Sequence, residues 1–219
     1  MNQKIYLNIL NQSQKDLLPL IKQYQSDYYL VGGTAIALLL GHRESIDFDL
    51  FTKKNKNQLK TKSNLLSKTS DNLISIYEGK DQAHFILNGV KLTFFNFLYP
   101  IPYSKTFEGI NMPNLLTLGA MKAFALGGRA KWKDYVDLYF ILHNTITLND
   151  IIIKTDELFN SENSTLFNYR NFMEQLMYYE DVSYEEEVIY VGNTKPTNEE
   201  IKDYLTNISL DYLKNNALK

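Results

Sequence analysis

Residues 45–51, SIDFDLF, place two carboxylates one residue apart inside an apolar run. The apolar side chains alternate with Asp47 and Asp49, and a period of two is typical of a strand with one apolar face and one polar face. Both aspartates then lie on the same face, with Cα atoms about 6.6 Å apart from the rise of a strand. Because like charges are costly to bury together, the pair either faces water or holds a cation between the carboxylates.

The residues before this strand predict a strand, a glycine turn and a helix. Residues 28–33, YYLVGG, have the pattern of a short strand that ends at Gly32 and Gly33. The apolar segment 34–41 predicts a buried helix with a glycine as its C-cap. Two glycines let main-chain N–H groups approach an anion closely, and the helix start adds the positive end of its dipole. We expect Thr34 to cap this helix or to contact a phosphate.

Carboxylates at this spacing can bind one or two Mg²⁺ ions, or Mn²⁺, that also bridge phosphate oxygens. A two-metal site stabilises the attacking and leaving oxygens of an in-line phosphoryl displacement. His42, Arg43 and Ser45 precede the strand in a turn. They are placed to contact phosphate or to orient the two carboxylates.

The remaining pattern predicts a mixed strand and helix half followed by a helical half. Three segments, 73–78, 83–88 and 90–98, have strand patterns, and an Asn-Gly pair between the last two indicates a hairpin. Residues 5–24 predict a helical region broken near Pro19. The lysine-rich residues from 53 predict a solvent-facing helix to about residue 68. Prolines 100 and 102 suggest a boundary between a core at 1–100 and a helical module at 101–219.

Composition limits the function classes. The chain has 219 residues, a net charge of −2 and no cysteine, which excludes disulfides, thiolate metal sites and cysteine nucleophiles. A global basic field for nucleic acid is absent, so any such contact needs a local patch. The first residues lack the pattern of a signal peptide, and no apolar run reaches the length of a membrane span. We therefore expect a cytoplasmic protein that does not bind membranes.

The stretch GGTAIALLLGHRESIDFDLF resembles a signature of the nucleotidyltransferase superfamily with the polymerase-beta-like fold. It is more similar still to the AbiEii/AbiGii-type toxins of abortive-infection toxin–antitoxin systems, which have Gly-Gly-Thr-Ala followed by Gly-His-Arg-x-Ser-x-Asp-x-Asp. The positions that match are Gly32, Gly33, Thr34, Ala35, Gly41, His42, Arg43, Ser45, Asp47 and Asp49. The resemblance implies an α/β (α+β) fold, a mixed sheet with flanking helices followed by a helical module.

A second match follows in the helical half. The same family has a lysine in one helix, an arginine near its end, and Lys-Asp-x-x-Asp at the start of the next helix. The matching residues are Lys122, Arg129, Lys133, Asp134 and Asp137. In the functional interpretation the cations bind triphosphate or the acceptor backbone, and Asp134 or Asp137 completes the site opposite the aspartate pair. The alternative is an ion-pair cluster between helices, such as Arg129 with Asp137.

The resemblance implies Mg²⁺-dependent transfer of an NMP from an NTP to RNA, tRNA or a protein, and a cognate antitoxin as partner. The lysines of residues 53–62 and the cations of residues 122–133 could bind RNA. One departure bears on catalysis. Enzymes of this superfamily usually carry a third carboxylate on a later strand, and the equivalent here is Thr93. Two alternatives therefore stay open: a catalytically degenerate protein that binds nucleotide or a partner, and an enzyme that modifies a small molecule such as an antibiotic.

Overall fold

A computed structural model of the chain describes residues 4–69, 73–126, 128, 130–184 and 187–216. One expected site residue, Arg129, lies outside this described part. The chain divides into two compact units, Met1–Asn114 and Leu115–Lys219.

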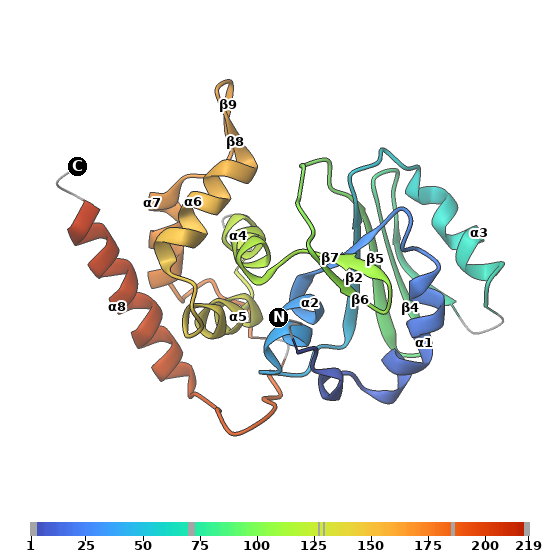
Figure 1. Ribbon diagram of the computed structural model, residues 1–219, viewed down its shortest axis with the longest axis horizontal. Helices are drawn as coiled ribbons and strands as arrows, with labels where there is room; N and C mark the ends of the chain where they lie inside the picture. The colour runs from blue at the N-terminus through green and yellow to red at the C-terminus, as the bar shows by residue number, and fades with distance from the viewer. Residues whose placement is uncertain (1–3, 70–72, 127, 129, 185–186, 217–219) are drawn as a thin grey trace. The chain divides into compact units, whose positions relative to one another are not determined.

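The first unit is built on a seven-stranded mixed sheet with the strand order β3–β4–β5–β2–β1–β7–β6 (Figure 1). Strand β2 pairs antiparallel with β1 and parallel with β5, so it lies inside the sheet. The strands are β1 (Tyr29–Val31), β2 (Asp47–Thr52), β3 (Leu73–Glu78), β4 (Gln82–Leu87), β5 (Val90–Asn96), β6 (Lys105–Phe107) and β7 (Ile110–Met112).

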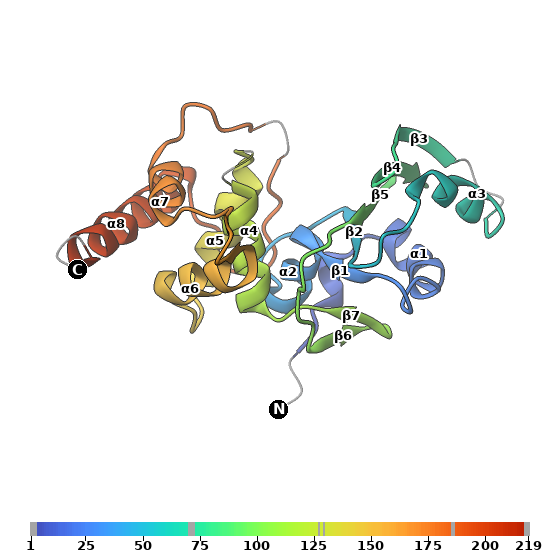
Figure 2. The ribbon, with the colours of Figure 1, turned by 90° about the horizontal axis from the view of Figure 1, so that it is seen from above.

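Helices cover both faces of this sheet. Helix α2 (Gly32–Leu40) lies on one face, and α1 (Gln12–Lys22) and α3 (Thr61–Leu66) lie on the other (Figures 1 and 2). Two 3₁₀ turns, η1 (Leu7–Ile9) and η2 (Gln58–Lys60), complete the described helical elements of this unit.

The core between the sheet and α1 is aromatic. Phe94 of β5 contacts the rings of Tyr24 and Tyr28, with ring centroids 5.0 Å and 5.4 Å away. Phe48 and Leu50 of β2 are fully buried, as the alternation of residues 45–51 predicts.

Three local predictions need correction. Helix α1 continues through Pro19 where a break was expected. Residues 53–57 are not helical, and the expected long helix is limited to η2 and α3. Strands β6 and β7 lie beyond the prolines and extend the first sheet, so the first compact unit ends at Asn114 and not at residue 100.

The second unit is helical, as expected. Its helices are α4 (Leu115–Leu126), α5 (Trp132–Leu142), α6 (Leu148–Phe159), α7 (Tyr169–Met177) and α8 (Asn198–Asn216), and β8 (Asn160–Ser161) with β9 (Ser164–Thr165) forms a small hairpin. None of the helices in the described part of the chain combines the length and the hydropathy that a membrane crossing requires.

Candidate functional site

Asp47 and Asp49 lie on one face of β2 and are partly exposed, whereas the residues between and beside them in the strand are buried. This is the arrangement that the alternation predicts. Val31, the last residue of β1 before α2, is the register partner of Asp49, so the pair lies at the end of the sheet where α2 begins.

Gly32 lies directly against Asp49. Its φ of 73° belongs to the left-handed region that favours glycine. A Cβ atom built on Gly32 would lie 2.0 Å from Oδ2 of Asp49, so any side chain at this position would displace the carboxylate. Helix α2 starts at Gly32 without a side-chain cap on its first N–H groups. Uncapped N–H groups at a helix start are donors for an anion.

The second glycine makes room for Arg43. A Cβ atom on Gly33 would lie 2.4 Å from Nη2 of Arg43. The Arg43 side chain is almost fully buried, and Nη1 donates to the Glu44 carbonyl at 2.9 Å. His42, which precedes it, is buried as well. The Arg43 side chain therefore packs against the glycine turn.

Thr34 and Ser45 bind each other. The Thr34 hydroxyl lies 2.8 Å from the Ser45 hydroxyl, and it also donates to the Asp47 carbonyl. Gln14 of α1 donates to the Ser45 carbonyl at 2.7 Å. Thr34 lies inside α2, and the N-cap is Val31, so the expectation that Thr34 caps the helix is wrong. These contacts fix the start of β2 to α2.

A row of side chains crosses the sheet from Asp49. Thr93 of β5 is the register partner of Asp49, and His84 of β4 is the register partner of Thr93. His84 Nδ1 lies 3.1 Å from Thr93 Oγ1, and His84 Nε2 lies 2.6 Å from Gln82 Nε2. Lys91 occupies the equivalent place beside Asp47. The strand neighbours of the aspartate pair are thus a hydroxyl and an ammonium group, with an imidazole behind the hydroxyl.

The surroundings of His84 favour its neutral form. Burial lowers the pKa of the imidazole below 6.5, and the charge of Lys91 lowers it further, while the charge of Asp49 acts in the opposite direction. At neutral pH the His84 ring therefore carries one N–H and one lone pair.

The second unit contains a buried ion cluster. Lys122 of α4 forms ion pairs with Asp134 and Asp137 of α5, and the distance from Nζ to Asp137 Oδ2 is 2.9 Å. All three side chains are nearly or fully buried. The cation therefore joins the two carboxylates that follow one another on the helix face. Lys133, which directly precedes Asp134 in sequence, is only partly buried.

The sequence matches the profile of the nucleotidyl transferase AbiEii toxin family, of the type IV toxin–antitoxin systems, over residues 20–204. The chain belongs to this AbiEii family. The curated relative "Uncharacterized protein aq_aa25" from Aquifex aeolicus (strain VF5) is 30% identical over 196 residues, which cover 87% of this chain and 90% of that protein.

Two solved structures share the fold. MenT4, the nucleotidyltransferase toxin Rv2826c from Mycobacterium tuberculosis H37Rv, superimposes with a TM-score of 0.57 and 14% identity over 90% of this chain and 80% of its own. A putative nucleotidyltransferase from H. pylori gives 0.52 and 16% identity over 96% of this chain and 95% of its own. The AbiEii chain therefore has the nucleotidyltransferase fold that its motifs imply.

AbiEii-family membership implies a nucleotide and a divalent cation, and the donors at β2 are suited to both. In the described residues, no three side chains among His, Asp and Glu converge on one point. Mg²⁺ is commonly bound through one or two carboxylates together with substrate phosphates and water, so two aspartates suffice as protein ligands. The Asp49 carboxylate lies against Gly32, at the uncapped start of α2. The carboxylate suits a cation, and the free N–H groups beside it suit phosphate oxygens.

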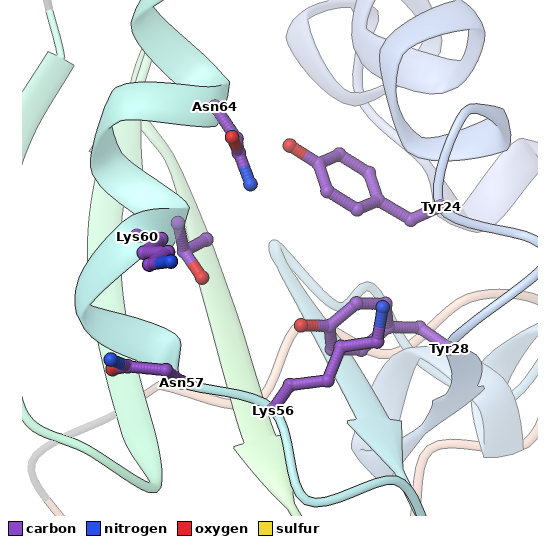
Figure 3. A pocket seen from close by; sticks show the side chains of 7 residues that line it. Tyr24, Tyr28, Lys56, Asn57, Lys60 and Asn64 are labelled. Atoms are coloured by element: carbon purple, nitrogen blue, oxygen red, sulfur yellow. The ribbon is translucent and has the colours of Figure 1, made fainter.

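The lysine-rich segment of this AbiEii chain is partly neutralised. Lys54 and Lys56 both pair with Asp27, and Lys62 pairs with Glu78 at 3.0 Å. The hydrogen bonds from both lysines hold the pKa of the Asp27 carboxyl below its usual value. A cavity of about 280 Å³ lies beside this segment (Figure 3), lined by Tyr24, Tyr28, Lys56, Asn57, Lys60, Thr61 and Asn64.

Sequence reasoning did not single out Lys91 beside Asp47, or the Gln82–His84 pair behind Thr93, as site residues. The signal for them was available, because a two-residue turn at Asn88-Gly89 pairs Leu87 with Val90 and so fixes every later partner. Metal-ligand spacing, which the three histidines of the chain lack, does not detect a histidine that contacts a hydroxyl.

Proposed function

We propose that this chain transfers an NMP from an NTP to an acceptor hydroxyl or phosphate, with a divalent cation, as the toxin of a toxin–antitoxin pair. The observation that supports this best is the position of Asp47 and Asp49, side by side on β2, with the Asp49 carboxylate against Gly32 at the uncapped start of α2. A carboxylate pair beside a helix start suits a metal–triphosphate complex better than it suits a neutral ligand.

The site residues of the first unit have distinct roles in the proposal. Asp47 and Asp49 would hold Mg²⁺ or Mn²⁺, and the bound ion would supply charge stabilisation at the reacting phosphate. The N–H groups after Gly32 donate to the phosphates. Arg43 packs against Gly33 and stabilises the glycine turn, and the hydrogen bond between Ser45 and Thr34 holds β2 against α2.

Two candidate site residues of the second unit, Asp134 and Asp137, form a buried ion cluster with Lys122. Lys122 is held by two buried carboxylates, which neutralise its charge. A role of Lys122, Asp134, Asp137 and Lys133 in binding triphosphate stays a prediction, as does the role of Arg129.

We propose RNA as the acceptor, with tRNA as the first substrate to test. Lys60, at the rim of the cavity in Figure 3, forms no ion pair with any residue that the structure describes, so its charge is available to a phosphodiester. Lys53 of the same segment forms no ion pair within the described part of the chain, and its Nζ lies 5.7 Å from the centroid of the Tyr103 ring. Membership of a toxin family supports a cognate antitoxin as the regulatory partner.

The test is a transfer assay with the full chain. Each α-labelled NTP is incubated with Mg²⁺ and total tRNA, and label on RNA is measured after electrophoresis. Asp47→Asn and Asp49→Asn should each reduce transfer by more than about 100-fold, because even residues behind the metal ligands cost 10–100-fold when changed. Asp203→Asn, an exposed aspartate on α8, is the matched control and should retain full activity.

A second candidate is a protein that binds nucleotide without transferring it. The observation that favours it is Thr93, which stands beside Asp49 where the superfamily usually has a carboxylate. NTP binding that depends on Asp49, with no label on tRNA or, in parallel incubations, on protein or an aminoglycoside, would select this candidate. Absence of both binding and transfer would contradict the two functions together. Label on the aminoglycoside alone would instead identify a small-molecule modifier.

A further inference from the structure

We propose that Thr93 is a nucleotide-binding donor and that His84 is the residue that positions it. In this proposal the Gln82–His84–Thr93 chain of hydrogen bonds directs the Thr93 hydroxyl hydrogen to a phosphate oxygen of the bound NTP at Asp49. It rests on the proposed function, because it assigns a ligand contact within that site.

The direction of the chain follows from its first member. An amide nitrogen only donates, so Gln82 Nε2 donates to His84 Nε2 across 2.6 Å. The lone pair of the neutral ring is therefore on Nε2, and the ring proton is on Nδ1. Nδ1–H then donates to Thr93 Oγ1 across 3.1 Å.

The Thr93 hydroxyl is thereby left as a donor. It has one hydrogen and two lone pairs, and the imidazole occupies one lone pair. Among the residues that the structure describes, no acceptor takes the remaining hydrogen. The Thr93 side chain is 5% exposed, and a buried hydroxyl hydrogen without an acceptor costs free energy unless a ligand or water accepts it.

The position of Asp49 indicates which ligand takes this hydrogen. Asp49 Oδ2 is turned toward Gly32 on the β1 side, and Thr93 is the register partner of Asp49 on the β5 side. The phosphate oxygen of the proposal is on the β5 side of the Asp49 carboxylate, next to its register partner Thr93. Phosphate oxygens accept hydrogen bonds strongly, and a charged acceptor makes such a bond stronger than a neutral one.

In this proposal Thr93 has a different role from the third carboxylate that the superfamily usually has at this position. A carboxylate at this position would act as a base or as a further metal ligand. A hydroxyl fixed by His84 acts as a donor to the nucleotide, and it adds no negative charge beside Asp47 and Asp49. Lys91, opposite Asp47, gives the same strand a second group that favours anions.

The test measures nucleotide binding, which does not require turnover. Each of the four NTPs is titrated calorimetrically into the full chain with Ca²⁺, to limit transfer. Thr93→Val should weaken binding about tenfold, the typical effect of losing one hydrogen bond to a charged group. Thr93→Ser, which keeps the hydroxyl, should bind within about twofold of the wild type.

His84 is tested through a double-mutant cycle with Thr93. His84→Phe removes the Nδ1 donor and should weaken binding by a similar factor, and His84→Asn, which places an amide N–H near the Nδ1 position, should restore most of it. Because His84 acts through Thr93, the double variant Thr93→Val with His84→Phe should bind no more weakly than Thr93→Val alone.

The outcomes separate the two proposals. Full affinity in Thr93→Val, or additive losses in the double variant, would overturn the inference and leave the proposed function intact. A wild-type chain that binds none of the four NTPs would overturn both. Circular dichroism of each folded variant identifies any loss of binding that comes from unfolding.

Discussion

The ammonium group of Lys122 lies 2.9 Å from the carboxylate of Asp137, and both side chains are buried inside the helical unit. Asp134 pairs with the same ammonium group. Removing one partner from a buried ion cluster leaves uncompensated charge, and this costs more than the pair itself contributes.

We therefore expect Lys122→Ala to lower the free energy of unfolding by about 3–5 kcal/mol, because two buried carboxylates lose their cation. Urea unfolding checks this value. Lys202→Ala, which removes an exposed pair with Glu199, is the control and should change stability by less than about 1 kcal/mol. A loss as small as that of this control would contradict the expectation that the Lys122 ion pairs stabilise the unit. Replacing Lys122, Asp134 and Asp137 together by Met, Asn and Asn should restore much of the loss.

Gly32→Ala and Gly89→Ala should separate backbone strain from displacement of the Asp49 carboxylate. Both glycines have positive φ, 73° and 79°, so each substitution should cost about 1–2 kcal/mol of stability. A Cβ atom at Gly89 meets nothing within 4 Å, whereas at Gly32 it displaces the end of the Asp49 side chain. We expect both variants to be destabilised in urea unfolding and only Gly32→Ala to lose nucleotide binding. Equal binding by the two variants would contradict the placement of Asp49 at the site.

The pKa of His84 should respond in opposite directions to its two charged neighbours. In NMR titrations, the wild-type His84 should titrate below 6.5, because burial and Lys91 disfavour the imidazolium form. Lys91→Gln should raise the pKa, and Asp49→Asn should lower it further. Since the unfolded chain protonates first, the contribution of His84 to stability is present above pH about 6.5 and decreases as the pH falls through the folded pKa. A pKa that moves the same way in both variants would contradict this arrangement.

Asp27 should contribute to stability above pH about 4 and lose that contribution in acid. Its pKa is lowered by hydrogen bonds from Lys54 and Lys56, so the unfolded chain takes up the proton first as the pH falls. Urea unfolding at pH 5 and pH 3 should therefore show a smaller acid effect in Asp27→Asn than in the wild type. The difference should be modest because the three groups are partly exposed.

The aspartate strand and the glycine turn were predictable because they depend on local rules. Alternation placed Asp47 and Asp49 on one face, and the glycine at the end of the apolar helix has the left-handed C-cap conformation that was expected of Gly41. The partner of Lys122 was harder to predict. Helical spacing brings Asp134 and Asp137 together, but which cation reaches them depends on how α4 packs against α5.

The lysine-rich segment shows where composition misleads. Five lysines without an acid in residues 53–62 suggested a solvated helix. Two of these lysines, Lys54 and Lys56, bind Asp27, which is distant in sequence. Asn57 then accepts from the Leu59 N–H and begins the short helical turn η2. Strands β6 and β7 were missed because each has only three residues.

The two-residue turn at Asn88-Gly89 sets which residues reach the aspartates from two strands away. Because the turn pairs Leu87 with Val90, it also pairs His84 with Thr93. One residue inserted there would slip β4 by a single position against β5, and a slip of one residue exchanges the two faces of a strand. Phe85 would then replace His84 on the polar side, and the imidazole would face the aromatic core. The length of this surface turn thus determines which side chain contacts Thr93, although neither His84 nor Thr93 belongs to the turn.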